Sequence, residues 1–193
     1  MKVLVACEYS GRVRDAFIAK GHYAVSCDLL DTDSQGPHYI GDVRNILSDG
    51  WDLMIAHPPC TYLSSSGLHW NTKRPTRAQQ TLDALDFVRL LLQAPIEKIA
   101  IENPIGCISS QIRKPEQIIQ PWQHGHAESK STCLWLKNLP LLIPSNIITK
   151  PLSGVWNNQT PSGQNKLGPS SDRWKIRSTT YAGIARAMAD QWG

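Results

Sequence analysis

The sequence predicts an α/β protein with a mostly parallel sheet and helices on both of its faces. Short β-branched runs alternate with helical patterns along the first half of the chain. Strands separated by helices in this way form parallel sheets, because each helix returns the chain to the same edge. The 193 residues, 41% hydrophobic and 19% charged, suit one folded domain with a sizeable core. We therefore expect a single domain over residues 1–193.

The first five strands and two helices follow from local periodicity. Helical spacing of apolar residues predicts a helix over Gly11–Lys20 and a longer one over Thr76–Leu92. Pro75 is well placed to open the second helix, since proline is favoured in a first turn. The predicted strands are Val3–Ala6, Tyr23–Cys27, His38–Gly41, Asp52–Ala56 and Ile96–Ile101.

Beyond the fifth strand the alternation weakens. We expect a helix, two extended segments, a long loop rich in Gly, Pro, Asn and Ser, and a closing helix that begins at Ser178 or Thr179. In that order they span Lys114–Gln120, Thr132–Leu136, Asn146–Thr149, Pro151–Pro169 and Tyr181–Trp192.

Composition narrows the setting in which the protein works. The five cysteines are widely spaced without a C-x-x-C pair, which indicates reduced thiols in a cytoplasm and neither a disulfide framework nor a zinc site. No apolar run is long enough to span a membrane, and Met1–Val5 enters a strand pattern without the layout of a signal peptide. We expect a soluble, cytoplasmic protein without a bound metal.

Charge is distributed unevenly along the chain. Residues 1–129 hold 12 Lys and Arg against 14 Asp and Glu, a net −2, whereas residues 130–193 hold 8 against 2, a net +6. A positive field of this kind is expected where a polyanion docks. The last third of the chain is therefore a candidate nucleic-acid or nucleotide contact.

Chemically active side chains follow all five predicted strands. Ligands of open parallel sheets bind beyond the carboxyl ends of the strands, so these positions should share one rim. A single carboxylate there is often only a helix cap, and Asp42 before 43–47 has that alternative. The five side chains are Glu8, Asp28, Asp42, Cys60 and Glu102.

The first strand ends in a turn that suits a nucleoside-containing cofactor. Ser10 and Gly11 allow the backbone to approach a ligand at the start of the next helix. Asp28 lies 17 residues after Gly11, close to the spacing of an acid that binds ribose hydroxyls. Arg12 and Arg14 stand where a dinucleotide fingerprint needs glycine, which disfavours nicotinamide cofactors.

Cys60 and Glu102 are the candidate catalytic residues. Pro58 and Pro59 fix the backbone before Cys60, so its thiol should be presented on a rigid loop, with a pKa lowered by nearby amide dipoles or cations. Glu102 precedes an Asn-Pro pair, and partial burial would raise its pKa and allow it to act as a general acid. The alternative for Glu102 is an ion pair with a basic residue.

These motifs resemble the cytosine-5 DNA methyltransferase family, and in particular its small phage and prophage relatives. The resemblance implies a Rossmann-like, class I methyltransferase fold and S-adenosylmethionine as cofactor. It runs over about residues 3–104 and returns at Ser178–Gln191. The matching motifs are Tyr9-Ser10-Gly11, Asp28, Gly41-Asp42, Pro59-Cys60 and Glu102-Asn103.

The resemblance also implies roles for individual residues. Cys60 would add to carbon 6 of cytosine, and Glu102 would supply a proton at N3, so that carbon 5 can take up a methyl group. The implied cofactor-binding residues are Glu8, Tyr9, Ser10, Gly11, Asp28, Asp42 and Pro58. The implied substrate-binding residues are Asn103, Lys130, Lys166, Arg173, Lys175 and Arg177.

The basic, loop-rich region 137–177 replaces the large target-recognition region that family members insert before their last motif. The protein would then take its specificity from a protein partner, or act on single strands or free nucleotides.

Three alternative functions stay open. One is amino methylation, although His57-Pro58-Pro59-Cys60 lacks that motif's amide and aromatic. The others are a zinc deaminase, which lacks its second cysteine, and a non-catalytic nucleotide or nucleic-acid binding module.

Overall fold

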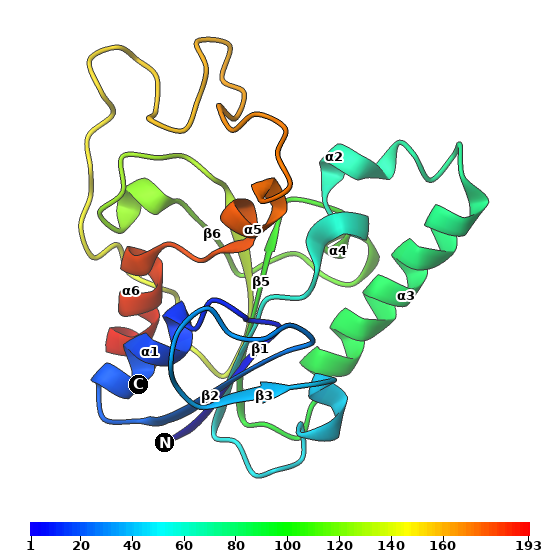
Figure 1. Cartoon of the computed structure of the whole chain (residues 1–193), viewed down its shortest axis with the longest axis vertical. Helices are drawn as coiled ribbons and strands as arrows, with labels where there is room; N and C mark the ends of the chain where they lie inside the picture. Colours follow the sequence, from blue (N-terminus) through cyan, green and yellow to red (C-terminus); the bar gives the residue numbers. More distant parts are fainter.

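A seven-stranded sheet forms the centre of the molecule, as the computed structural model of residues Met1–Gly193 shows (Figure 1). Its strand order is β3-β2-β1-β4-β5-β7-β6. The first five strands are parallel, and β7 runs antiparallel to both β5 and β6. The strands are β1 (Lys2–Ala6), β2 (Tyr23–Asp28), β3 (His38–Ile40), β4 (Leu53–Ala56), β5 (Lys98–Pro104), β6 (Gln117–Ile119) and β7 (Thr132–Lys137).

The strand order creates a switch point between β1 and β4. The chain moves outward from β1 to β2 and β3, then crosses back to place β4 and β5 on the other side of β1. In such sheets the loops after the two central strands diverge and leave a crevice for ligands. The sheet is mostly parallel and Rossmann-like, with helices on both faces, which confirms the predicted α/β fold class.

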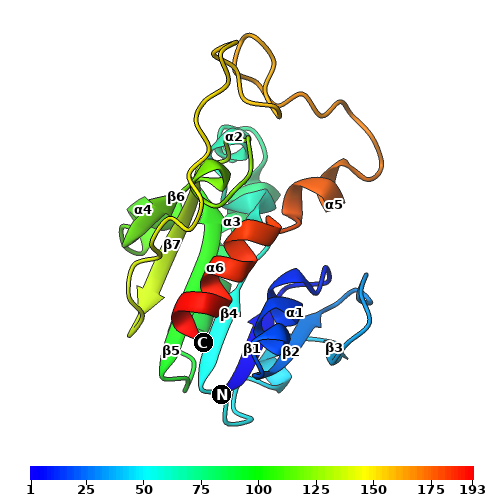
Figure 2. The same ribbon diagram turned by 90° about the vertical axis from the view of Figure 1, so that its left-hand side faces the viewer.

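Helices cover both faces of the sheet. Figure 2 shows α1 and α6 packed side by side on one face, and Figure 1 shows α3 along the other. Each face buries its own apolar core, with Phe17 and Met188 on the α1/α6 side and Met54 and Leu91 on the α3 side. None of the helices combines the length and the apolar composition needed to cross a membrane. The helices are α1 (Arg12–Ala19), α2 (Ser65–Leu68), α3 (Pro75–Leu92), α4 (Ile108–Gln111), α5 (Arg173–Ser178) and α6 (Ala182–Trp192), with short 3-10 turns η1 (Val43–Asn45), η2 (Cys60–Tyr62) and η3 (Pro121–Gln123).

Three local predictions were wrong. The segment 114–120 forms strand β6 and not a helix, because Ile119 is buried while Ile118 faces solvent, a period of two that pairs with β7. Asn146 makes only an isolated bridge to His124, so 146–149 is not a strand. The closing helix α6 begins at Ala182 with Tyr181 as its N-cap and not at Ser178 or Thr179, and the short helix α5 precedes it, beyond the predicted loop 151–169. The loop prediction holds, since no helix or strand occurs between Lys137 and α5.

Candidate active site

A cavity of about 430 Å³ opens at the switch point, on the α3 side of the sheet. Three of the sequence-predicted cofactor residues, Asp28, Asp42 and Pro58, line it. The side chains of Leu29, Val43 and Phe87 form apolar parts of the cavity wall. The complete lining is Cys7, Cys27, Asp28, Leu29, Gly41, Asp42, Val43, Arg44, Pro58, Pro59, Tyr62, Leu63, Gln80, Asp83, Ala84 and Phe87.

Asp42 both caps a helical turn and faces this cavity. Its carboxylate accepts a hydrogen bond from the Arg44 backbone N–H (2.9 Å) and pairs with the Arg44 guanidinium (2.8 Å). The backbone hydrogen bond, followed by the side-chain contact, lowers the pKa of Asp42. The capping alternative from the sequence is thus present together with the cavity position. Asp42 therefore presents an ionised carboxylate to the cavity.

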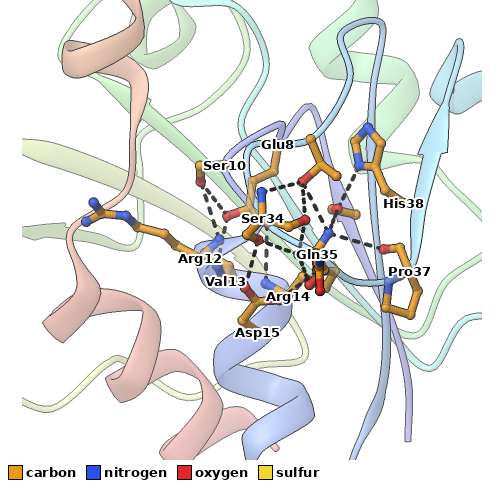
Figure 3. Close-up of polar contacts among 12 residues, drawn as sticks. Glu8, Ser10, Arg12, Val13, Arg14, Asp15, Ser34, Gln35, Pro37 and His38 are labelled. Atoms are coloured by element: carbon orange, nitrogen blue, oxygen red, sulfur yellow. Dashed lines mark hydrogen bonds and ion pairs between the residues drawn. The ribbon is translucent and has the colours of Figure 1, made fainter.

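The turn between β1 and α1 is satisfied internally, as Figure 3 shows for its polar contacts. Glu8 is only 4% exposed. Its carboxylate accepts hydrogen bonds from the backbone N–H groups of Val13 (2.8 Å) and Arg14 (3.3 Å) and from Ser10 Oγ (3.1 Å). Glu8 therefore caps the first turn of α1, and it does not line the first cavity, where its position after β1 had predicted a cofactor contact.

Arg14 is turned inward against the loop that follows β2. Its guanidinium is fully buried and donates to Ser26 Oγ (3.0 Å), to Ser34 Oγ (2.5 Å) and to the backbone carbonyls of Ser34 (3.1 Å) and Gln35 (3.3 Å) (Figure 3). Gly11, at φ 70°, has Ser34 and Arg14 so close that a Cβ would collide with them. The space beside this turn is filled by the protein itself.

Tyr9 holds helix α5 against the same turn. Its hydroxyl donates to the Lys175 carbonyl (2.7 Å), and its ring lies 5.8 Å from that of Trp174. The Lys175 ammonium pairs with Asp33 (2.7 Å), which raises the pKa of Lys175. Tyr9, Ser10 and Gly11 consequently do not line the cavity. Lys175, expected to contact phosphate, has a carboxylate partner instead.

The Cys60 thiol lies at the start of η2, directly after the two prolines, and Cys60 is exposed. This exposure agrees with the loop presentation expected from the sequence. The pKa of Cys60 is raised, first by local desolvation and second by the charge of Glu102, while Lys130 and Arg177 act in the opposite direction. The expected lowering of this pKa was therefore wrong, because desolvation and the charge of Glu102 outweigh the two cations.

Glu102 is paired with His57, a residue that the sequence analysis did not select. His57 Nδ1 lies 2.9 Å from Glu102 Oε2, and the two side chains are 9% and 15% exposed. Burial alone would raise the pKa of Glu102, but the hydrogen bond and charge of His57 outweigh it and lower that pKa. The same pairing outweighs burial at His57 and raises the pKa of the imidazole.

This pair corrects the expectation that Glu102 is a neutral acid at rest. The single proton belongs to the pair, held between imidazole and carboxylate. His57 Nε2 is buried without a hydrogen-bond partner. The sequence did contain a signal for this pairing. His57 directly follows β4, and Glu102 lies near the end of the neighbouring parallel strand β5, so both side chains reach the same edge of the sheet. Glu102 therefore forms the ion pair with a basic residue that the sequence left open as its alternative role, and His57 is the partner.

Asn103 and Lys130 bind the protein itself. Asn103 is buried, and its Nδ2 donates to the Pro58 carbonyl (2.7 Å), which ties the end of β5 to the turn before Cys60. Lys130 Nζ donates to the Arg177 carbonyl (2.9 Å). Asn103 thus positions the thiol loop through its Nδ2, while its Oδ1 is buried without a partner.

A second cavity, of about 490 Å³, lies beside the Lys130 side chain. Lys166 and Arg177 line it together with Lys130, as the sequence predicted for a substrate contact, whereas Arg173 and Lys175 do not. Arg173 donates to the Gly168 carbonyl (3.0 Å). The lining is Glu128, Ser129, Lys130, Asn158, Gln159, Gly163, Asn165, Lys166, Leu167, Ile176, Arg177, Thr179 and Tyr181. No group of three or more His, Cys, Asp or Glu side chains is arranged to hold a metal ion.

Comparison with known proteins gives distant structural likenesses only. No protein-family model matches the chain, and no curated protein matches it. A DNMT2 mutant from Spodoptera frugiperda is similar with 17% sequence identity and a TM-score of 0.45, over 78% of this chain and 55% of that one. WbdD in complex with a kinase inhibitor is similar with 13% identity and a TM-score of 0.37, over 90% of this chain and 47% of that one. The chain thus spans about half the length of each of these proteins.

Proposed function

We propose that the protein is an S-adenosylmethionine-dependent methyltransferase that acts on carbon 5 of cytosine, in DNA or in a nucleotide, through a covalent adduct with Cys60. The observation that carries the proposal is the position of the exposed thiol. Cys60 follows two prolines that line the first cavity, and it experiences the charges of Lys130 and Arg177, which line the second. A proton-holding pair, His57 and Glu102, lies at the next strand end.

The first cavity fits the cofactor. Asp28 supplies a carboxylate for ribose hydroxyls, Asp42 one for the adenine amino group, and Phe87 an apolar surface for the adenine ring. Its 430 Å³ lie within the range of small-molecule sites. When bound, S-adenosylmethionine supplies an electrophilic methyl group carried on a sulfonium.

The residues on the thiol side account for the activation of cytosine. The Cys60 thiol loses its proton to solvent and its sulfur forms a bond to carbon 6, while a separate proton passes from His57 through the Glu102 carboxyl group to N3, which leaves the imidazole neutral. Electron density then rests on carbon 5, which would take the methyl group from the sulfonium of a bound cofactor, and that cofactor would leave as the neutral thioether. A base from solvent then removes the carbon 5 proton, and the electron pair of that bond expels the Cys60 sulfur as a thiolate. The N3 proton returns to the pair of Glu102 and His57, and the product is released.

The resting charge of Glu102 sets the order of these events. An ionised Glu102 raises the pKa of Cys60, so the thiol is protected as long as the pair holds its proton on His57. Once the proton has moved to N3, the substrate carries a positive charge close to the sulfur. That charge favours the thiolate, so adduct formation is coupled to substrate entry.

Transfer of labelled methyl groups from S-adenosylmethionine to DNA, RNA and deoxycytidine nucleotides tests the proposal. We expect label on carbon 5 of cytosine with the wild type and none with Cys60→Ala. Cys107→Ala is the matched control, because the Cys107 side chain is buried in the apolar core on the α3 side of the sheet and lines neither cavity. Activity that survives in Cys60→Ala, or label on an exocyclic amine, would contradict the proposal.

A further inference from the structure

We infer that the second cavity binds an unpaired nucleotide through its phosphate and base edge, so that the acceptor is a single-stranded segment or a free nucleotide and not a closed duplex. This inference rests on the proposed function for its biological setting, because it names the substrate class of that site. It is carried separately by the construction of the loop that covers the cavity.

The covering loop is fixed to the body of the protein. The Asn158 side chain makes two hydrogen bonds with Ser129, to its N–H (3.1 Å) and its carbonyl (2.8 Å), and the Asn157 N–H donates to the Ala127 carbonyl (3.0 Å). Trp156 stacks on Trp122, with ring centroids 6.0 Å apart and planes 9° apart. These contacts hold the start of the loop as a preformed wall.

A short hairpin then returns the chain to the cavity. Gln159 and Asn165 form an antiparallel bridge, and the Thr160 N–H donates to the Gln164 carbonyl (2.7 Å). The Lys166 N–H donates to the Asn158 carbonyl (2.9 Å), which places Lys166 at the rim. The hairpin thus adds a cation and the Gln159 side-chain amide to a cavity whose other wall is α5.

The cations of the cavity have no acidic partner. No ion pair of the protein involves Lys166, Arg177 or Lys130, and both Lys166 and Arg177 are exposed. The one carboxylate in the lining, Glu128, accepts a hydrogen bond from the Tyr181 hydroxyl (2.5 Å). That contact, after burial, raises the pKa of Tyr181 and keeps the phenol neutral. An anion of phosphate size is the complement of such a set.

Size and the absence of a groove-reading element decide between an unpaired nucleotide and a duplex. A cavity of about 490 Å³ accommodates one nucleotide, whereas sequence is read in the major groove by a helix or a two-stranded ribbon. The chain between Lys137 and α5 contains neither, apart from the single bridge of the hairpin. The hairpin covers the cavity and cannot also enter a groove.

The cavity is coupled to the reactive thiol. The charges of Lys130 and Arg177 oppose the rise in the pKa of Cys60, and the charge of Lys130 also contributes to the lowered pKa of Glu102. A phosphate bound by these cations would place the attached or adjacent pyrimidine at the thiol side of the sheet. The positive charge of the last third of the chain is thereby assigned to substrate capture at one specific cavity.

Calorimetric binding of four probes at one fixed salt concentration tests the inference. The probes are deoxycytidine, its 5′-monophosphate, a cytosine-containing single-stranded oligonucleotide and the same oligonucleotide in a duplex. We expect the monophosphate to bind more tightly than the nucleoside, and the single strand more tightly than the duplex. In the double variant Lys166→Ala/Arg177→Ala, affinity for the phosphate-bearing probes should fall at least about tenfold.

The matched control is Arg89→Ala/Lys114→Ala, which removes the same charges from residues that do not line the cavity. If the double variant loses affinity for the monophosphate, a free nucleotide is sufficient for binding at the cavity. If it loses affinity only for the single-stranded oligonucleotide, the cavity requires a strand. Equal losses in both double variants, or tighter binding of the duplex than of the single strand, would overturn the inference. Using Cys60→Ala protein separates the two proposals, since binding does not depend on turnover.

Discussion

The turn after β1 and the ends of β4 and β5 occupy neighbouring positions at the same rim, yet they treat their polar groups in opposite ways. At the turn, Glu8 and Arg14 are buried and satisfied by hydrogen bonds within the protein. At the strand ends, His57 Nε2 and Asn103 Oδ1 are buried without partners. The first region is built for stability, and the second retains unsatisfied groups beside an exposed thiol.

This difference matters because unsatisfied buried groups are costly. Each one costs about 1–3 kcal/mol, so the two beside the thiol call for an explanation, which a bound ligand or a proton transfer would supply. From the sequence alone, both regions were predicted to contact a ligand, and nothing distinguished them. Hydrogen bonding within the protein separates them, and the following variants test the separation.

The largest expected effect is on stability, at Arg14. Arg14→Ala removes the buried guanidinium and leaves the carbonyls of Ser34 and Gln35 without donors. We expect the free energy of unfolding to fall by about 3–4 kcal/mol, measured by urea denaturation. Arg14→Lys should recover only part of the loss, because an ammonium does not reproduce the planar guanidinium fork. A loss of less than about 1 kcal/mol in Arg14→Ala would mean that the turn is not the stabilising region.

The second expected effect is a pH-dependent stability difference at His57. His57→Gln keeps an N–H donor but removes the charge. The raised pKa of His57 contributes stability below its unfolded value of 6.5, and that contribution is lost as pH rises through the folded pKa. The lowered pKa of Glu102 contributes stability above its unfolded value of 4.5, and that contribution is lost as pH falls through the folded pKa.

The stability difference between wild type and His57→Gln should therefore be greatest between pH 4.5 and 6.5, on the order of 1–3 kcal/mol, and fade on both sides. Thermal unfolding followed across this range measures it. A difference that is flat with pH would show that the two side chains do not share a proton.

The third effect concerns cofactor affinity. Asp28→Asn removes a carboxylate from the first cavity, and we expect S-adenosylmethionine to bind about tenfold more weakly, as measured by calorimetry. Tyr9→Phe removes a hydroxyl that binds α5 and should leave that affinity unchanged. If Tyr9→Phe weakened the affinity and Asp28→Asn did not, the turn after β1 would be the cofactor contact.

The smallest effect is on thiol reactivity at Cys60. Lys130 lowers the pKa of the thiol, so Lys130→Met should shift the pH profile of alkylation by iodoacetamide toward higher pH. At a fixed pH below the pKa the rate should fall by less than about tenfold. Lys137→Met, at the far end of β7, should leave the profile in place.

The sequence predicted the parallel strands and the long helices because their signals are local. The apolar runs of β1 and β4 and the periodicity of α3 need no tertiary information. Strand β6 was misassigned because only three residues carry its alternation, and it becomes a strand by pairing with β7.

The place of the candidate site at the strand ends follows from the sequence, whereas its charges do not. Cys60 and Glu102 were selected because a double proline and the end of a strand are visible in the sequence. The partner of Glu102 was not, since His57 lies 45 residues earlier and meets it only through the pairing of β4 with β5. The same limit applies to Lys175, whose partner Asp33 is 142 residues away.

The most direct test of the account is mass spectrometry of the protein after incubation with S-adenosylmethionine and a single-stranded oligonucleotide that contains 5-fluorocytosine. Fluorine replaces the proton whose loss releases the enzyme, so attack at carbon 6 leaves a stable adduct. We expect a covalent complex that maps to the peptide containing Cys60 and is absent in Cys60→Ala. Methylated product without any adduct, or an adduct at another cysteine, would contradict the account.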